Sequence, residues 1–173
     1  LVAWVVLFFA MAPNLPDATR TAMHEACARA ARVWGYRSAG TMEFLVDNRA
    51  NFYFLELNAR LQVEHPVTEL VTGLDLVAEQ LRVAAGGVLS RTGVVEPIGA
   101  AIECRINAED PSQGFRPSAG RLTAVRFPSE ARIDGWIETG VEVTPFYDPM
   151  LAKVIVAADT REHAIEKLVS VLD

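Results

Sequence analysis

The spacing of apolar residues changes near residues 90–97, and this change restricts how the chain can fold more than any other feature. Before it, apolar and small residues recur at helical spacing in long segments. After it, short stretches of branched residues alternate with glycine, proline and aspartate turns, which is typical of short strands. We therefore expect an α+β fold in two parts, residues 1–90 and residues 97–173. The expected strands of the second part cover residues 100–106, 121–127, 132–138 and 151–157.

Three segments have the periodicity of amphipathic helices. Residues 17–34 carry their apolar and small side chains on one face, with Asp17 as the expected N-cap and Gly35 as the expected stop. The other expected helices are residues 75–85, which end at Gly86-Gly87, and residues 162–172, which Asp159 or Thr160 can cap.

Charge and cysteine content narrow the function classes. Sixteen Lys and Arg residues against 22 Asp and Glu residues give a net charge of −6, which argues against a nucleic-acid-binding face or an anionic-membrane anchor. Any anionic substrate must therefore meet a few locally placed cations. Cys27 and Cys104 are far apart and match no metal-ligand spacing, which predicts two buried thiols in a reducing cytoplasm.

Residues 1–12 contain no polar side chain. A membrane span needs about 20 apolar residues, and a signal peptide needs basic residues ahead of its apolar stretch, so this run fits neither pattern. Ala10-Met11-Ala12 nevertheless mimics a cleavage site. Three interpretations stay open: a buried segment, a sequence artefact and a targeting remnant.

Two runs rich in aromatic and branched residues, 40–47 and 51–58, are separated by a polar link and predict a β-hairpin. The shortest link that leaves both strands intact closes through residues 49–50. In that register Glu43 lies directly opposite Glu56, so the two carboxylates face each other.

A pair of opposed carboxylates requires compensation, because like charges across strands cost roughly 0.2–1 kcal/mol. Mg²⁺ commonly takes one or two carboxylates together with substrate phosphates. Glu43 and Glu56, with the amide oxygen of Asn58, would suit this cation. The alternatives are an exposed hairpin edge with solvated acids and a register one residue different.

From residue 56 to residue 64 every even position is polar and every odd position is apolar. In an extended chain one face would carry Arg60, Gln62 and Glu64. A cation, an amide and an acid placed together can bind a small oxyanion and remove its proton. An amphipathic strand with one wet face would give the same alternation.

Two further residues have structural interpretations when considered alone. His65-Pro66 fixes the backbone and is expected to end the strand, with His65 as a hydrogen-bonded structural residue rather than a catalyst. Arg105 lies in an alternating strand, where an ordinary ion pair with Glu103 or Glu109 is expected.

Four strings carry a family resemblance: FYFLELNARLQVEHPVTE at residues 52–69, GAAIECRINAED at 99–110, FRPSAGRLT at 115–123 and FYDPMLAKV at 146–154. They resemble, in order and spacing, the biotin carboxylases, which are ATP-grasp enzymes that carboxylate biotin. The resemblance runs from about residue 12 to the chain end. It implies the C-terminal half of an ATP-grasp domain, residues 1–90, followed by a truncated, strand-rich biotin carboxylase C-terminal domain, residues 97–173.

The resemblance implies a site for ATP and Mg²⁺ or Mn²⁺ on the hairpin. Glu43 and Glu56, helped by Asn58, would hold the metal ions that bridge the ATP phosphates. Leu45 would lie near the adenine. These assignments agree with the hairpin register derived above.

The resemblance also implies the chemistry. Arg60, Gln62 and the backbone of Val63 would hold bicarbonate, and Glu64 would be the general base that deprotonates it for attack on the γ-phosphate of ATP. The product, carboxyphosphate, decomposes to carbon dioxide and phosphate. The phosphate then takes the N1 proton of biotin, and Arg105 would stabilise the resulting enolate-like ureido oxygen.

The chain departs from the family pattern in its first part. The family has a polar stretch before Pro13-Asn14, where this chain has Ala3-Trp4-Val5 and Phe8-Phe9. The glycine-rich lid, the ATP-gripping lysines and a Met-Lys-Met biotin attachment motif are absent from the sequence. We therefore expect the isolated chain to be inactive, to bind MgATP weakly and to self-associate through residues 1–11.

Two hypotheses follow. The first is part of the biotin carboxylase of a cytoplasmic biotin-dependent carboxylase, a C–N-forming ligase. Residues 132–153 resemble urea carboxylases more than acyl-CoA carboxylase subunits, with pyruvate carboxylase as a further alternative. It would bind bicarbonate, and its protein partners would be biotin carrier and carboxyltransferase units and a second copy of itself. We expect it to bind neither nucleic acid nor a membrane. The second hypothesis is a non-catalytic remnant or binding module that retains the fold.

Overall fold

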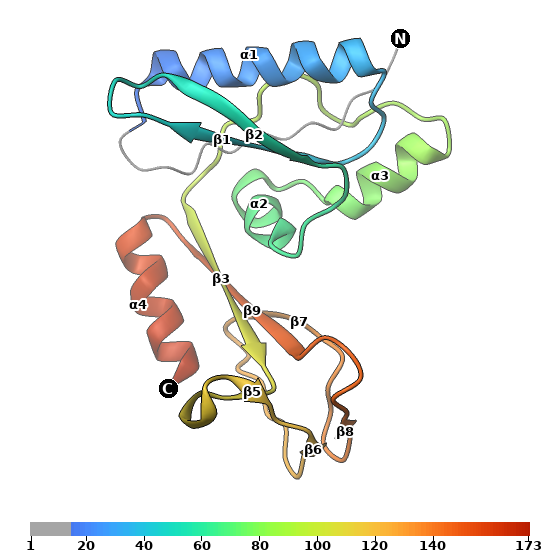
Figure 1. The fold of residues 1–173 in the computed structure, drawn as a ribbon, viewed down its shortest axis with the longest axis vertical. Coiled ribbons are helices and arrows are strands. Elements are labelled where there is room, and N and C mark those ends of the chain that lie inside the picture. Colours follow the sequence, from blue (N-terminus) through green and yellow to red (C-terminus); the bar gives the residue numbers. More distant parts are fainter. Residues whose placement is uncertain (1–14) are drawn as a thin grey trace. The chain divides into compact units, whose positions relative to one another are not determined.

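The computed structural model describes residues 15–173, in which helices and strands are mixed as expected for an α+β chain. The chain forms two compact units that divide between Pro97 and Ile98 (Figure 1). The expectations for residues 1–12 lie outside the described residues.

The first unit begins with α1 (Asp17–Trp34). Its extent is as predicted, and Gly35 ends it in the left-handed conformation, with φ of 63°. The predicted N-cap was wrong, because Pro16 occupies that position and Asp17 is the first helical residue. Proline fixes the backbone at this point, and the Asp17 carboxylate in the first turn still favours the positive end of the helix dipole.

A hairpin of β1 (Thr41–Val46) and β2 (Phe52–Asn58) follows α1 along the chain. Helix α1 runs alongside this hairpin in Figure 1. The Thr19 hydroxyl donates to the Ala50 carbonyl at 3.2 Å and so ties the first turn of α1 to the hairpin loop. Phe44 lies edge-on to both Phe52 and Phe54, which gives the hairpin its own aromatic cluster.

The chain then forms α2 (His65–Thr72), which the sequence reasoning missed. Pro66 was expected to end a strand, but it lies in the first turn of this helix, where its missing N–H costs no hydrogen bond. Gly73, with φ of 67°, closes the helix, and its N–H donates to the Glu69 carbonyl at 2.8 Å.

Helix α3 (Leu76–Ala84) confirms the second predicted helix. The Asp75 carboxylate caps it by accepting from the Ala78 N–H at 2.8 Å. The buried carboxylate of Glu69 accepts from the Leu76 N–H, also at 2.8 Å. One side chain from α2 therefore satisfies a free donor at the start of α3 and fixes the two helices together.

The second unit is built on a three-stranded antiparallel sheet in the order β3-β9-β7. Its strands are β3 (Ala100–Asn107), β7 (Arg132–Gly135) and β9 (Met150–Ala158). Strand β9 is central and almost entirely buried, and α4 (Arg161–Leu172) packs against β9 and β3 (Figure 1). Thr160 caps α4 as predicted, because its hydroxyl accepts from the His163 N–H at 3.2 Å.

Short pairings complete the second unit. The predicted strand over residues 121–127 was wrong, because the strand there is limited to Gly120–Arg121. Residues 122–127, which include branched residues, form no regular strand, and the Val125 N–H donates to the Thr139 hydroxyl at 2.9 Å. The short elements are β4 (Glu109–Asp110), the 3₁₀ turn η1 (Pro111–Gln113), β5 (Arg116–Pro117), β6 (Gly120–Arg121) and β8 (Glu142–Val143), with β4 paired to β5 and β6 paired to β8.

The two thiols differ in environment. Cys27 is buried as predicted, and burial raises the pKa of its thiol to about 12. Cys104 is only half-buried, which corrects the expectation for that residue. Across residues 15–173, no helix has the length and apolar character needed to cross a membrane.

Candidate functional site

The hairpin places Glu43 opposite Glu56, as the sequence predicted. Thr41 also pairs with Asn58 in the same register. Beyond this point a β-bulge intervenes, because Phe44 pairs with Phe54 and leaves Leu55 as the extra residue of β2.

The link between the strands is longer than predicted. It comprises residues 47–51 rather than residues 49–50, and Ala50 takes the left-handed conformation with φ of 63°. The Asp47 carboxylate organises it by accepting from the backbone N–H groups of Arg49 and Asn51, each at 2.9 Å. Hydrogen bonds led by the Asn51 side-chain amide hold the pKa of Asp47 below its usual range.

The longer loop and the bulge have opposite effects on register. The loop shifts the pairing by one residue relative to the prediction, and the bulge at Leu55 shifts it back before Glu43 is reached. The two acids are therefore opposed although the predicted turn was wrong. A one-residue difference would have moved one carboxylate to the other face.

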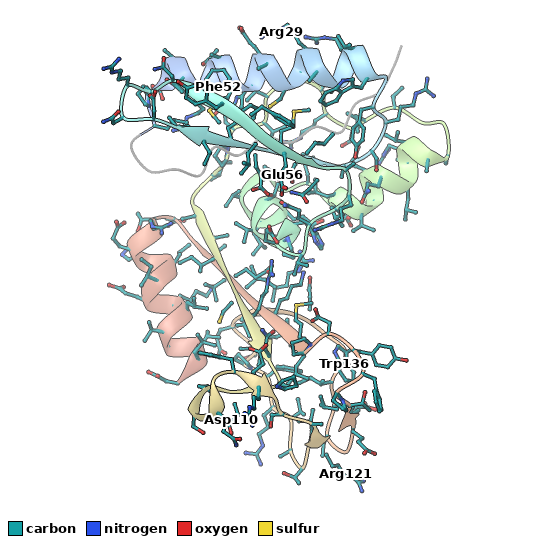
Figure 2. The ribbon with its side chains drawn as sticks, in the orientation of Figure 1. Arg29, Phe52, Glu56, Asp110, Arg121 and Trp136 are labelled. Atoms are coloured by element: carbon teal, nitrogen blue, oxygen red, sulfur yellow. The ribbon has the colours of Figure 1, made fainter. Side chains whose placement is uncertain are left out.

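The Asn58 side chain joins the two acids. Its Nδ2 donates to Oε1 of Glu43 at 2.9 Å and to Oε1 of Glu56 at 3.1 Å. Both carboxylates therefore lie on one side of the hairpin. Figure 2 labels Glu56, near the end of β2. In this arrangement the amide presents its N–H₂ group to the acids, whereas the sequence analysis expected its oxygen to join them as a metal ligand.

The two carboxylates suit a magnesium ion that takes its remaining ligands from water and substrate rather than from the protein. Within residues 15–173, no group of three or more His, Cys, Asp or Glu side chains could enclose a metal. Two carboxylates and one amide are the set expected where Mg²⁺ completes its octahedron with water and substrate phosphates. Leu45 lies two residues from Glu43 on β1 and is exposed, which leaves its side chain accessible to a ligand.

The extended run predicted through Glu64 ends early. Strand β2 stops at Asn58, the chain bends at Arg60, and a turn at residues 63–64 leads into α2. His65 closes this turn, because its Nδ1 lies 2.8 Å from the Gln62 carbonyl. The expected hydrogen bond of His65 is thereby confirmed, although the residue begins a helix rather than ending a strand.

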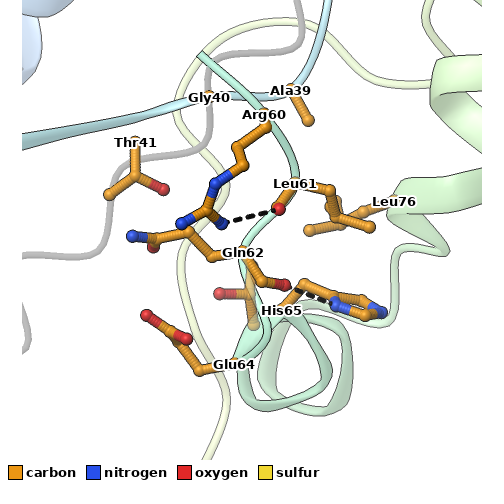
Figure 3. A pocket seen from close by; sticks show the side chains of 10 residues that line it. Ala39, Gly40, Thr41, Arg60, Leu61, Gln62, Glu64, His65 and Leu76 are labelled. Carbon is orange, nitrogen blue, oxygen red and sulfur yellow. Dashed lines mark hydrogen bonds between the residues drawn. The ribbon is translucent and has the colours of Figure 1, made fainter. Parts of the chain in front are cut away.

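This bend creates a pocket lined by Arg60, Gln62 and Glu64 (Figure 3). The three side chains predicted to bind a small oxyanion are therefore brought together, by a bend and a helix start rather than by strand alternation. Arg60 Nη1 donates to the Leu61 carbonyl at 3.1 Å, which folds the guanidinium back over the bend. Val63 contributes to the turn beneath them.

Other pocket residues escaped the sequence reasoning. Thr41 and Thr68 line it, and so does Gly40. A Cβ at Gly40 would lie 3.0 Å from the Tyr36 hydroxyl and 3.2 Å from the Asn58 carbonyl, so a larger residue would press against the start of β1. The glycine before the strand was the available signal, but its packing partners are set by the tertiary structure.

Arg105 belongs to the second unit, on β3. Its Nε lies 3.9 Å from Oε1 of Glu103, which confirms the ion pair expected from sequence alone. Its side chain is about half exposed. The guanidinium is therefore both anchored and accessible.

Comparisons with known proteins identify the family. The chain matches the model for the carbamoyl-phosphate synthase L chain, ATP binding domain, over residues 5–92. It matches the model for the biotin carboxylase C-terminal domain over residues 103–173. The chain belongs to the biotin carboxylase family. The resemblance stated from the sequence motifs is confirmed.

Individual relatives show the extent of this biotin carboxylase match. Biotin carboxylase 2 of Bacillus subtilis is 50% identical over 94% of this chain and 37% of its own length. The crystal structure of the K. lactis urea amidolyase superposes with a TM-score of 0.89 and 53% identity, over 93% of this chain and 10% of that one. The biotin carboxylase domain of Hydrogenobacter thermophilus 2-oxoglutarate carboxylase, solved with MgADP, ADP and bicarbonate, has a TM-score of 0.88 and 43% identity, over 94% of this chain and 37% of that one. The chain thus spans 10% to 37% of the length of these three proteins.

Proposed function

We propose that this chain provides the metal, bicarbonate and biotin side of an enzyme that carboxylates biotin with ATP and bicarbonate. The observation that carries the proposal is the pocket of Arg60, Gln62 and Glu64, formed directly after the strand that bears the acid pair. In this proposal a single segment, from β2 to the start of α2, binds bicarbonate next to the metal ion that accompanies ATP. The relative solved with MgADP and bicarbonate binds these same two classes of ligand.

Glu43, Glu56 and Asn58 are the proposed metal-binding residues, with Mg²⁺ or Mn²⁺ as the ion. When bound, the metal would neutralise charge on the ATP phosphates. For Asn58 to participate, its amide would rotate so that the oxygen replaces the N–H₂ group now facing the carboxylates. We further propose that Leu45, exposed on the same hairpin, contacts the adenine.

In the proposed reaction Arg60 holds bicarbonate through its guanidinium, with Gln62 and the Val63 backbone completing the site. Glu64 is exposed at the rim of the pocket and takes the bicarbonate proton. The bicarbonate oxygen then attacks the γ-phosphorus and ADP leaves, which gives carboxyphosphate. After its decomposition the released phosphate takes the N1 proton of biotin, N1 attacks carbon dioxide, and Arg105 stabilises the ureido oxygen.

The domain assignment follows from the same proposal. Residues 1–90 would be part of an ATP-grasp domain, and residues 97–173 would be part of the biotin carboxylase C-terminal domain. We propose cytoplasmic biotin carrier and carboxyltransferase units as partners, self-association of the complete enzyme, and urea as the final acceptor. The 53% identity to the K. lactis urea amidolyase supports urea, although biotin carboxylase 2 of Bacillus subtilis is almost as similar.

A chimaera tests the proposal directly. Residues 15–173 replace the matching segment of Bacillus subtilis biotin carboxylase 2, and bicarbonate-dependent release of phosphate from ATP is measured with and without biotin. We expect activity, and we expect Glu64→Gln to lower it by roughly 10²–10⁴-fold with ATP binding little changed. A folded, ATP-binding chimaera without activity would contradict the proposed function. Near-normal turnover of the Glu64→Gln form would remove Glu64 from the mechanism.

A further inference from the structure

A row of charged residues crosses the three-stranded sheet of the second unit. Lys153, in the central strand β9, pairs directly with Arg105 of β3 on one side and with Asp134 of β7 on the other. Residues paired across antiparallel strands share a face, and so do residues two apart in one strand. Glu103 therefore lies on the same face as Arg105 and Lys153.

Glu103 is the link between the two cations. Its Oε1 lies 3.9 Å from Nε of Arg105, and its Oε2 lies 3.9 Å from Nζ of Lys153. Lys153 is also 3.6 Å from Oδ2 of Asp134. Each carboxylate oxygen of Glu103 thus faces a different cation.

Burial differs sharply between the members of this chain of contacts. The side chains of Glu103 and Lys153 are 4% and 9% exposed, whereas that of Arg105 is 48% exposed. Strand β9, which carries Lys153, is held in the core by its own fully buried residues Ile155 and Val156. The anchor is therefore rigid, while the guanidinium that it holds reaches solvent.

The far side of Lys153 is fixed as well. Asp134 accepts two hydrogen bonds from Arg132, at 2.9 Å from Nε and 3.0 Å from Nη2. Such a bidentate pair fixes the orientation of the carboxylate. Asp134 is thus a fixed partner that helps to hold Lys153 in place between two acids.

Stability alone is a weak reason for this arrangement. Buried ion pairs often contribute no more to stability than apolar residues of the same volume, because desolvation offsets their attraction. Fixing a long arginine side chain, however, removes rotamer freedom that must otherwise be lost when a ligand binds. The geometry therefore favours a role in orienting the Arg105 guanidinium.

We propose that Glu103 and Lys153 are positioning residues for Arg105. Glu103 holds the Nε edge of the guanidinium, and Lys153 fixes Glu103 in turn. The outer part of the guanidinium is then oriented toward the ureido oxygen of biotin. This inference rests on the proposed function, in which Arg105 stabilises that oxygen.

The first test uses the chain itself and measures side-chain motion. The ¹⁵N relaxation of the arginine Nε–H groups is recorded for the original chain and for Glu103→Gln, Lys153→Met and Lys153→Arg. We expect the Arg105 order parameter to fall below about 0.6, the flexible range, in Glu103→Gln and Lys153→Met and to recover in Lys153→Arg. The backbone amide spectrum should stay dispersed in all of them.

Glu25→Gln is the matched control, because Glu25 also lies 3.9 Å from an arginine, Arg29, but both side chains are more than 60% exposed. The control should leave Arg105 unchanged. An Arg105 order parameter that stays the same in both Glu103→Gln and Lys153→Met, with the fold intact, would overturn the inference. Should Lys153→Met fail to fold, Glu103→Gln decides, because it leaves Lys153 paired with Asp134.

The second test uses the chimaera and separates the two proposals. Glu103→Gln should lower kcat/KM for biotin by about tenfold, while bicarbonate-dependent ATP cleavage without biotin stays unchanged. A merely structural role would lower both reactions together, which would contradict the inference. If Arg105→Ala lowers biotin carboxylation but Glu103→Gln does not, the positioning role fails and the proposed function stands. If Arg105→Ala has no effect on biotin carboxylation, the proposed role of Arg105 fails, and the inference fails with it.

Discussion

Replacing Glu43 by glutamine should make the metal-free hairpin more stable. Glu43 and Glu56 are opposed across β1 and β2, and without a bound metal their like charges repel. Glutamine retains an Oε1 that can accept from Asn58, so the substitution removes charge while preserving the hydrogen bond. Relief of repulsion is therefore the main expected effect.

The hydrogen-bond geometry sets the magnitude. Oε1 of Glu43 and Oε1 of Glu56 lie 2.9 and 3.1 Å from the same nitrogen, so they are at most about 6 Å apart. Two unit charges at that separation repel by about 0.7 kcal/mol in water. This energy corresponds to about a threefold change in an equilibrium constant.

Native-state hydrogen exchange of the hairpin amides is the appropriate assay, because it reports local opening rather than unfolding of both units. In low salt with a chelator, the β1 and β2 amides of Glu43→Gln should exchange about threefold more slowly than those of the original chain. The difference should vanish near 1 M salt, where the Debye length is about 3 Å. Glu130→Gln, which removes an exposed carboxylate from a turn of the second unit, is the control and should leave hairpin exchange unchanged.

Added Mn²⁺ should reverse the order of the exchange rates, so that the hairpin amides of the original chain exchange more slowly than those of Glu43→Gln. The ion stabilises whichever form binds it, so added Mn²⁺ should slow exchange in the original chain more than in Glu43→Gln. Faster exchange of the variant in metal-free, low-salt buffer would refute the reasoning, because it would show that the opposed carboxylates do not repel each other. Equal protection of both forms by Mn²⁺ would remove Glu43 from the proposed metal site.

Three further predictions concern the scaffold. Asp134→Asn should destabilise the chain by about 1–3 kcal/mol at pH 7, since it breaks charged hydrogen bonds to Arg132. Those hydrogen bonds, followed by the charges of Arg132 and Lys153, lower the pKa of Asp134. The stability that Asp134 contributes is therefore present above its ordinary pKa of 3.8 and is lost as the pH falls through its lowered pKa in the folded chain. The free energies of unfolding of the two forms, measured with urea, should converge in acid. At pH 8 a disulfide reagent should label half-buried Cys104 in the folded chain, whereas Cys27, whose pKa is raised to about 12 by burial, should react only on unfolding. Asp75→Ala removes the N-cap of α3 and should cost about 1 kcal/mol in thermal unfolding, and equal stability would show that Glu69 suffices as a cap.

The hairpin shows how far local reasoning extends. Alternating aromatic and branched residues placed both strands, and the opposed acids followed from counting residues. The count was right only because the five-residue loop and the bulge at Leu55 compensate each other. Neither feature has a strong local signal, since Ala50 rather than glycine takes the left-handed conformation.

The bend after Asn58 shows where local reasoning fails. Strict polar alternation predicted an extended strand through Glu64, but the chain turns and begins α2 at His65. Proline is compatible with either outcome, because it can end a strand or occupy the first turn of a helix. The hydrogen bond between His65 and the Gln62 carbonyl, and the Glu69 carboxylate at the start of α3, stabilise the helical outcome.

The sequence by itself determined the α+β character, the three longest helices, the glycine that ends α1, and the family, and it supplied the candidate residues for binding a cation and an oxyanion. These follow from periodicity, capping and motif, which depend on neighbours along the chain. Only the tertiary structure decided that Arg60, Gln62 and Glu64 share a pocket and that Lys153 lies against Glu103, the ion-pair partner of Arg105. Those arrangements depend on strand pairing and on the burial of charges between segments as many as 50 residues apart, for which adjacent residues carry no signal.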